Sequence, residues 1–527
     1  MKKILRYLMV VALLVYVNFG YAQETKLENM TLQDAVFMAL KNSLDLQVQK
    51  IDTEIAGKNL KIYKNRFWIP TLEGYLYGSK TKSPSSDFLS GSTDVSTSKN
   101  LIGDLTLTQP LPWGGSLAIN ADSSWYKSNS SYSFVNPNIN SQLKFTLNQP
   151  LLKGFGMTSS KYNIYIAANN NKISQLQLKE NVIQLIFDVE SAYWELVYAH
   201  QNLEASQKAL ERARDLLKQN EIKMKVGTIG AIEVLSAKAE VARNESSVIS
   251  AERTIQTNER ALKRILNLNK DNISITPTDK PDVRPVPVDY KTFLDEALKN
   301  RTDINRARLN LENNNIQVKY AKNLALPSLN LLANYYTKGS GGTRMIFREG
   351  ASPFDPNFNP ETDIIGFIKK SAGDTWTDVF KSLYKNYNFQ VSFELPVSFA
   401  ANKAEVAVAK YGRDKALLQY HIVENTVYSE VKEVIMDLET NKKLVEADNL
   451  AMELEGENLK AEEKKLEVGI STNFNVITIQ QQYAQAQVQA LRSTINYALT
   501  IARLNRILNR SVNQFGLKFN EITIEKK

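Results

Sequence analysis

Two stretches of this chain, VGTIGAIEVL at residues 226–235 and VGISTNFNVI at residues 468–477, interrupt long segments of helical periodicity. Their glycines, Gly227 and Gly469, lie 242 positions apart (469 − 227). Glycine readily adopts the positive φ that ends a helix sharply. Each stretch therefore predicts a tight turn between two helices, and the matching sequences suggest that one chain makes the same hairpin twice.

The flanking sequence extends this correspondence into an internal repeat. The motif ALKN opens each half, at residues 39–42 and 297–300, and RILN closes each half, at residues 264–267 and 506–509. Between each VG turn and the following RILN, the offset of 242 holds without a gap. Self-similarity at a fixed spacing indicates a repeated structural unit, here of roughly 240 residues.

Helical periodicity predicts six helices. They cover residues of about 32–67, 158–225, 230–266, 292–322, 402–467 and 472–508. A helix of about 65 residues is close to 100 Å long, which requires lateral partners. Apolar side chains recur at every seventh position of both long helices, as in a coiled coil. These rows are Leu196, Leu203, Leu210, Leu217 and Met224, and Leu438, Val445, Met452, Leu459 and Leu466.

Two inserts between the helices alternate apolar and polar residues, which is typical of strands with one apolar face. The first insert, about 71–149, predicts four strands, at 71–79, 101–109, 116–126 and 141–149, and the second predicts two, at 328–337 and 386–396. Residues 339–385 are expected to form an extracellular loop that contains a short amphipathic helix. A soluble sandwich alternates in the same way. Four to six strands cannot close a wide barrel alone, so we expect the chain to oligomerise to close the sheet.

The first 22 residues have the pattern of a secretory signal peptide. Lys2, Lys3 and Arg6 precede the apolar run LMVVALLVYV, and Gly20 and Ala22 place small residues at a cleavage site. Removal of three cations leaves a charge of +6 (9 − 3) on the mature chain. This modest charge does not indicate nucleic-acid binding, and the absence of cysteine excludes disulfides.

The sequence contains no pattern that predicts chemistry. His200 and His421 lie on different predicted helices without a carboxylate arrangement for metal binding or base catalysis. No GxxxxGK[ST] phosphate-binding loop occurs. We therefore expect no catalytic, cofactor-binding or metal-binding residues, and we expect that the protein is not an enzyme.

Taken together, the twin ALKN, VG and RILN motifs and the proline before each insert resemble the TolC-like outer-membrane efflux family. The resemblance covers nearly the whole mature chain. It implies a mostly α fold with a membrane β-barrel part, in which long antiparallel coiled-coil helices form a trimeric α-barrel tunnel. Strands from each protomer would complete one shared outer-membrane β-barrel of 12 strands (3 × 4) or 18 strands (3 × 6). The implied location is the outer membrane of a Gram-negative cell, extending into the periplasm.

The resemblance also implies function and partners. The homotrimer would be the exit duct of a tripartite efflux or type I secretion system and would conduct substrates passively. They would come from a periplasmic adaptor protein and an inner-membrane transporter of the RND or ABC type. Docking of the adaptor is expected at Val226, Gly227, Val468 and Gly469, although such glycines also end helices that have no partner. The periplasmic aperture is expected at Glu233, Asn475 and Thr478, where family members often carry acidic residues after the second turn.

The predicted organisation is therefore a signal peptide, two repeats and two connecting segments. The repeats cover residues 23–267 and 292–509, the Pro-rich crossover 268–291, and the tail 510–527, with crossover and tail in an equatorial region. Two alternatives remain: a trimeric coiled-coil surface stalk or adhesin, and a periplasmic adaptor without a pore. The cargo is not identified by any motif.

Overall fold

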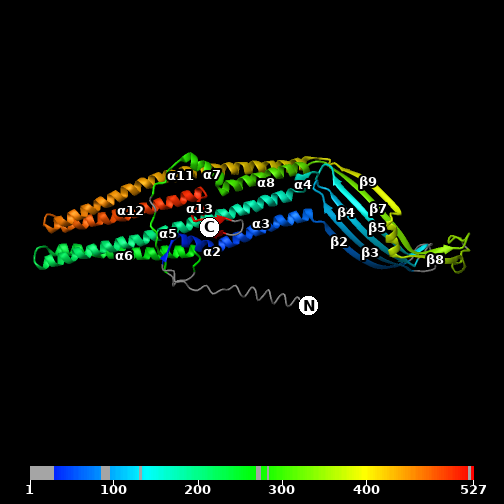
Figure 1. Ribbon diagram of the computed structural model, residues 1–527, viewed down its shortest axis with the longest axis horizontal. Coiled ribbons are helices and arrows are strands. Elements are labelled where there is room, and N and C mark those ends of the chain that lie inside the picture. Colours follow the sequence, from blue (N-terminus) through cyan, green and yellow to red (C-terminus); the bar gives the residue numbers. More distant parts are fainter. Residues whose placement is uncertain are drawn as a thin grey trace, which may run out of the picture. The chain divides into compact units, whose positions relative to one another are not determined.

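The computed structural model describes residues 29–84, 95–129, 133–268, 274–281, 284–355, 357–519 and 524–526, and Figure 1 shows its elements. The chain forms two compact units. The first contains Met1–Lys50, Gln177–Thr302 and Glu424–Lys527, and the second contains Ile51–Leu176 and Asp303–Val423. The predicted signal peptide, residues 1–22, lies outside the described residues.

The helices are α2 (Leu32–Asn42), α3 (Leu44–Trp68), α4 (Met157–Ser160), α5 (Tyr162–Lys225), α6 (Ala231–Ile265), α7 (Tyr290–Asn300), α8 (Thr302–Leu324), α9 (Pro360–Asp363), α10 (Ala372–Phe380), α11 (Ala400–Glu467), α12 (Asn473–Ile507) and α13 (Ser511–Gln514). Short strands β1 (Asn29–Met30) and β6 (Thr276–Pro277) pair in parallel, and β10 (Leu517–Phe519) pairs with β11 (Ile524–Lys526). No helix in the described part of the chain has both the length and the apolar composition for a membrane crossing.

Three predicted helices are each two helices in the structure. The predicted helix 32–67 is divided at Ser43, which adopts an extended conformation and whose Oγ accepts a hydrogen bond from the Leu46 N–H. Serine favours such caps because its hydroxyl replaces a missing backbone partner. The predicted helix 292–322 is divided at Arg301, which is also extended. The predicted helix 158–225 consists of the short α4 followed by α5.

The RILN and ALKN motifs meet in two contacts, which we call the first and second joints. Asn267 and Asn509 end α6 and α12 with φ values of 54° and 57°, a conformation that asparagine tolerates better than most residues. In the first joint, Asn267 Nδ2 donates to the Asn42 carbonyl at 3.1 Å. In the second joint, Asn509 Nδ2 donates to the Asn300 carbonyl at 2.7 Å. Each terminal asparagine therefore also ties its helix to the end of α2 or α7.

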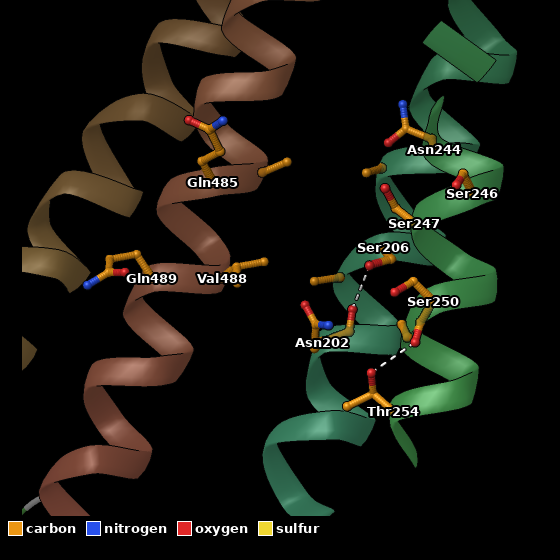
Figure 2. A pocket seen from close by; sticks show the side chains of 14 residues that line it. Asn202, Ser206, Asn244, Ser246, Ser247, Ser250, Thr254, Gln485, Val488 and Gln489 are labelled. Atoms are coloured by element: carbon orange, nitrogen blue, oxygen red, sulfur yellow. Dashed lines mark hydrogen bonds between the residues drawn. The ribbon is translucent and has the colours of Figure 1, made fainter. Parts of the chain in front are cut away.

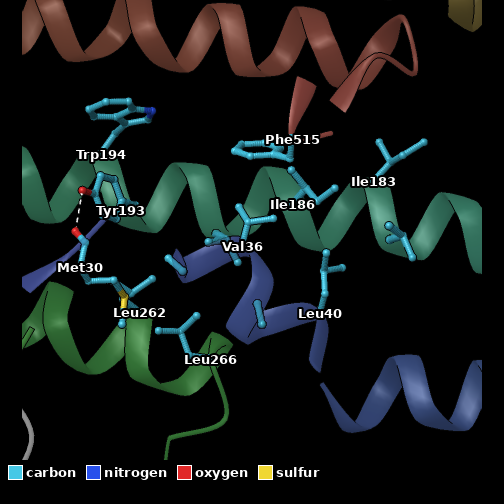
Figure 3. Packing of buried hydrophobic residues seen from close by; sticks show 14 of the residues in the cluster. Met30, Val36, Leu40, Ile183, Ile186, Tyr193, Trp194, Leu262, Leu266 and Phe515 are labelled. Atoms are coloured by element: carbon cyan, nitrogen blue, oxygen red, sulfur yellow. Dashed lines mark hydrogen bonds between the residues drawn. The ribbon is translucent and has the colours of Figure 1, made fainter. Parts of the chain in front are cut away.

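In the first unit, α5 and α6 face α12 across a polar groove of about 730 Å³ (Figure 2). The main apolar core lies elsewhere along the same helices, where α2 packs against α5 and α6 (Figure 3). Its members include Met30, Val36, Ile186, Leu262 and Leu266, all nearly inaccessible to solvent. Burying each of these side chains stabilises the folded state by about 1.5–3 kcal/mol relative to leaving it exposed.

Tyr193 fastens the N-terminal strand and the crossover segment to this core. Its ring is fully buried, and its hydroxyl donates to the Met30 carbonyl at 3.0 Å. The same hydroxyl accepts from the backbone N–H groups of Thr278 and Asp279, both at 3.2 Å. One phenol therefore satisfies the backbone of both the N-terminal strand and the crossover segment, as a buried hydroxyl requires.

The second unit contains an antiparallel sheet in the order β2-β3-β4-β5-β7-β8, with β9 also paired to β7. Its strands are β2 (Thr71–Pro84), β3 (Val95–Pro110), β4 (Ser116–Ser128), β5 (Val135–Pro150), β7 (Ser328–Phe347), β8 (Ile364–Lys370) and β9 (Tyr384–Glu394). The β5–β7 ladder joins the two halves of the sequence, with Pro150 opposite Asn330.

The second insert differs from its prediction. It contains three strands rather than two, because the strand opposite β7 is divided into β8 and β9. The predicted loop 339–385 is therefore mostly regular structure: β7 continues to Phe347, and β8 and α10 follow. The turn-forming glycines at 339–342 suggested a loop, but they lie within β7.

Register separates the side chains of this sheet onto two faces. One row across six strands is apolar or aromatic: Leu72, Leu107, Ile119, Phe145, Tyr335 and Tyr387. The adjacent row points to the other face: Glu73, Thr106, Asn120, Lys144, Tyr336 and Asn386. On this polar face Asn334 accepts from Thr146 and donates to Asn388, both at 2.7 Å. The sheet therefore has an apolar face and a hydrogen-bonded polar face.

Candidate functional site

The two hairpin tips have the same backbone geometry. At the first tip, the N–H of Gly227 donates to Met224 at 3.0 Å, and that of Thr228 donates to Lys223 at 2.9 Å. At the second tip, Gly469 and Ile470 make the corresponding bonds at 3.3 and 3.0 Å, to Leu466 and Lys465. This is the pattern of a Schellman motif, which requires a left-handed residue. Gly227 and Gly469 supply it, with φ values of 77° and 81°.

Apolar side chains at both tips are exposed. Val226 and Val468 are 69% and 71% exposed. The first turns of the following helices add further apolar groups, which are Ile232 and Leu235 on α6, and Ile470 and Phe474 beside or on α12. Clustered exposed apolar groups commonly mark an interaction surface. Sequence analysis singled out only the VG pairs and missed these four residues, although their apolar character beside a predicted turn was visible.

The predicted aperture residues lie just after the tips. Glu233 is in the first turn of α6, where a carboxylate complements the helix dipole. Asn475 occupies the matching position of α12, and its N–H donates to the cap residue Thr472 at 3.4 Å. Thr478 lies one turn further and donates to the Phe474 carbonyl at 2.8 Å. All three therefore have local structural roles at helix starts.

A buried carboxylate connects α6 to α12 near the tips. Glu240 is almost fully buried and accepts from Gln481 Nε2 on α12 at 2.7 Å. It also accepts from Arg243 and from Asn244 on its own helix. Hydrogen bonds to a charged group are stronger than neutral ones. Glu240 is a further candidate that was not predicted from the sequence, because the sequence does not indicate which residue of another helix a polar side chain contacts.

The polar groove of Figure 2 begins where this contact ends. Serine, threonine, asparagine, glutamine and alanine line most of it, including Ser206 on α5, Ser247 on α6 and Gln485 on α12. Farther along the helices, Arg492 on α12 donates to Glu195 on α5 at 2.8 and 2.9 Å. Polar contacts thus join the two hairpins on either side of a groove that lacks apolar packing.

Glu190 is another buried carboxyl group of the first unit. Glu190 on α5 is 2% exposed, and Gln514 donates to its Oε1 at 3.4 Å. Burial raises the pKa of Glu190 to about 7, and the bond from Gln514 opposes this only in part. Within the described residues, no group of three or more potential metal ligands occurs.

Comparisons with known proteins agree with this geometry. The family model described as outer membrane efflux protein matches residues 116–268 and 293–510, more than half of the chain. No curated protein sequence matches the chain. The resemblance predicted from the twin motifs is confirmed by the family match.

Solved structures share the fold at low identity. They include the Campylobacter jejuni CmeC outer membrane channel, at 18% identity over 91% of this chain and 86% of that chain, with a TM-score of 0.61. They also include the outer membrane protein VceC from Vibrio cholerae, at 15% identity over 90% and 95%, with a TM-score of 0.59. The open state of the Neisseria gonorrhoeae MtrE outer membrane channel matches at 19% identity over 91% and 89%, with a TM-score of 0.57. The solved structures show the shared fold, and the family model matches both halves of the sequence. The chain therefore belongs to the outer membrane efflux protein family.

Proposed function

We propose that this protein is the outer-membrane exit duct of a tripartite efflux or type I secretion system. It conducts substrates passively, while an inner-membrane RND or ABC transporter supplies the energy and a periplasmic adaptor joins the two. Its family is one of channel proteins, not of enzymes. The observation that carries the proposal is the two-faced open sheet of the second unit.

In the described part of the chain, one free edge of the sheet is β2, and the other is formed by β9 and β8; the side chains of β2 and β9 are exposed along almost their whole length. Unpaired strand edges cannot face lipid, because their N–H and C=O groups would lack hydrogen bonds. Six strands, β2, β3, β4, β5, β7 and β9, alternate in direction, so β9 of one copy meets β2 of the next in antiparallel orientation. A homotrimer then closes a barrel of 18 strands (3 × 6), with the apolar face toward lipid and the polar face toward a water-filled lumen.

The hairpin tips are the proposed docking surface for the adaptor. Val226, Gly227, Val468 and Gly469 form this surface together with the exposed apolar residues that follow each tip. Glu233, Asn475 and Thr478 are proposed to line the periplasmic aperture. Near the tips the hairpins are joined by polar contacts such as Glu240–Gln481 and by a small apolar cluster of Leu216, Val476 and Ile477, so their separation would expose far less apolar surface than opening the main core.

Conductance in a planar lipid bilayer tests the channel. The purified protein is expected to be trimeric in detergent and to open water-filled pores, whereas a coiled-coil stalk, an adhesin or a periplasmic adaptor would conduct no ions. A monomeric protein that leaves bilayers non-conducting would refute the proposal.

Crosslinking in cells tests the partners. A photoreactive residue at Val468, an exposed position that does not need the special conformation of Gly469, is expected to capture a periplasmic adaptor. The matched control is the exposed residue Glu252, farther along α6. Equal capture of the adaptor from both positions would exclude the tips as the specific docking surface.

A further inference from the structure

Helix α10 interrupts the edge strand of the sheet. β8 and β9 both pair with β7, with Lys370 opposite Gly342 and Tyr384 opposite Lys338. The residues between them, 371–383, leave the strand and form α10. Its start is fixed by a capping box between Ser371 and Asp374. This segment is therefore a built element of the fold rather than a connecting loop.

Small residues position α10 on the apolar face of the sheet. A Cβ atom added at Gly339 would lie 2.0 Å from the Thr375 carbonyl oxygen, and one at Gly341 would lie 2.7 Å from the Thr375 methyl carbon. Ser141 lies opposite Gly339, and its Oγ is 2.7 Å from Thr375 Oγ1. Gly339 and Tyr335 are four residues apart on β7, and so are Ser141 and Phe145 on β5, so each pair lies on the same face of the sheet. Helix α10 therefore covers the face that carries these aromatic side chains.

Helix α10 buries polar groups beside Val379 and leaves aromatic side chains at its surface. Its buried residues are Thr375, Asp378 and Val379, and Asp378 pairs with Lys370 on β8. Its exposed residues include the polar Asp374 and Thr377 and also Phe380, which is 72% exposed and packs against the partly exposed Trp376 with ring centroids 5.8 Å apart. A water-facing helix normally buries its apolar stripe. The exposed aromatic pair therefore indicates an apolar environment outside α10.

Polar groups border this aromatic pair. Lys381 follows Phe380 and is exposed, and Lys385 lies at the end of the apolar row of β9. A surface with aromatic groups on one flank and lysines on the other fits the boundary between acyl chains and headgroups, where long cationic side chains reach toward water.

The distance along β7 also places α10 near the boundary between acyl chains and headgroups. Gly339 lies 11 residues beyond Ser328 (339 − 328), the first residue of β7. At about 3.4 Å per residue this is about 37 Å along the strand, or about 26–31 Å along the barrel axis for a tilt of 35–45°. The apolar band of an outer-membrane barrel is about 25 Å tall. With Ser328 taken as the inner edge of this band, α10 lies at its outer boundary.

We propose that α10 is an interfacial helix that binds the lipid of the outer leaflet, with Trp376 and Phe380 inserted among acyl chains. This inference rests on the proposed function, because it takes the apolar face of the sheet as the lipid-facing one. The occupant is lipid rather than a second copy of the chain, since the exposed aromatic surface continues the apolar face of the sheet.

Site-directed spin labelling tests this inference. The chain has no cysteine, so single substitutions give unique labelling sites. A nitroxide is attached at Phe380→Cys, Lys381→Cys and Tyr387→Cys in the full-length protein reconstituted into liposomes. Phe380 and Tyr387 are 72% and 76% exposed, so neither substitution removes core packing. Collisions with oxygen report lipid, and collisions with a polar nickel chelate report water.

We expect the oxygen-to-nickel collision ratio at Phe380→Cys to match that at Tyr387→Cys, and to exceed that at Lys381→Cys by about fivefold or more. A water-like ratio at Phe380→Cys with a lipid-like ratio at Tyr387→Cys overturns the inference and leaves the proposed function standing. A label at Phe380→Cys that neither reagent reaches also overturns it, because another protein surface would then cover α10. A water-like ratio at Tyr387→Cys contradicts the lipid-facing sheet itself.

Discussion

The two ends of α6 close in the same way but have different surroundings. Its C-terminal end ties to α2 through Asn267, and Leu262 and Leu266 are buried there in the main core. Its N-terminal end follows the first tip, where Ile232 and Leu235 are exposed. One end of the helix packs into the main apolar core, whereas the other exposes its larger apolar side chains and buries the smaller Val234 and Ala237 beside Glu240. The comparison predicts that the joint end of α6 contributes much more to stability than the tip end does.

The largest expected difference between the two ends concerns stability. Leu262→Ala should lower the free energy of unfolding by about 2–5 kcal/mol, because it leaves a cavity in a packed core. The matched control on the same helix is Leu235→Ala, which removes the same atoms from an exposed position and should leave stability nearly unchanged. Denaturant unfolding in detergent measures both. Similar losses for the two variants would contradict the proposed division of α6.

The free energy of unfolding should also depend on pH through Glu190, which contacts Gln514 just beyond the second joint. In the folded chain the Glu190 carboxyl group stays protonated up to a pH of about 7, whereas the ordinary pKa of a glutamate is 4.5. The folded state therefore binds more protons between these values, and the free energy of unfolding falls as pH rises through this window. At 1.36 kcal/mol per pKa unit the fall is about 3 kcal/mol.

Glu190→Gln should remove this slope while leaving the neutral hydrogen bond to Gln514 possible. Unfolding measured at pH 4.5 and at pH 8 checks it, with Glu204→Gln as the control at an exposed ion pair with Lys208. If Glu190→Gln retains the full dependence on pH, another group is responsible.

The same comparison explains which features could be predicted from the sequence. Local features were accessible: VG predicted a left-handed glycine that ends a helix, RILN marked the end of the last helix in each half, and the alternation in β2 to β5 indicated strands. The break at Ser43 was missed because helical periodicity continues on both sides of it. The Glu240–Gln481 contact was missed because it joins residues 241 positions apart through tertiary packing. Helix α10 was anticipated only as a segment of a loop, since its position depends on Gly339 and Ser141 meeting across two strands.

At the tip end, removal of Glu240 should loosen the contact between the hairpins. Glu240→Ala abolishes the acceptor for Gln481, Arg243 and Asn244, each of which bonds to its carboxylate. We expect the single-channel conductance of the reconstituted protein to rise by about twofold or more, since charge-assisted hydrogen bonds are worth about 1.5–3 kcal/mol each. Glu204→Gln serves again as the surface control. Unchanged conductance with intact folding would show that this contact does not restrict the aperture.

Tips and joints use different residues for the same left-handed position: glycine at 227 and 469, asparagine at 267 and 509. No atom would contact a Cβ at either glycine within 4 Å, so conformation alone selects it. Gly469→Val should therefore strain the second tip by about 1–3 kcal/mol, whereas Gly469→Asn should be tolerated. Hydrogen exchange of the Ile470 N–H, which bonds to Lys465, should accelerate only in the valine variant. Equal exchange in both variants would argue against a conformational requirement.

The smallest expected effect concerns a difference between the tips themselves. Glu233 and Asn475 occupy matching positions after Gly227 and Gly469, so only the first repeat places a carboxylate there. In a trimer this gives a ring of three carboxylates, whose field favours cations in a narrow aperture. Glu233→Gln should lower the cation-to-anion permeability ratio in planar bilayers, and Asn475→Glu should raise it. Because exposed charges are screened within about 8 Å at physiological salt, both changes should fade as salt increases. If the ratio is the same in both variants, Glu233 acts only at the start of α6, and the two tips differ in sequence without differing in permeation.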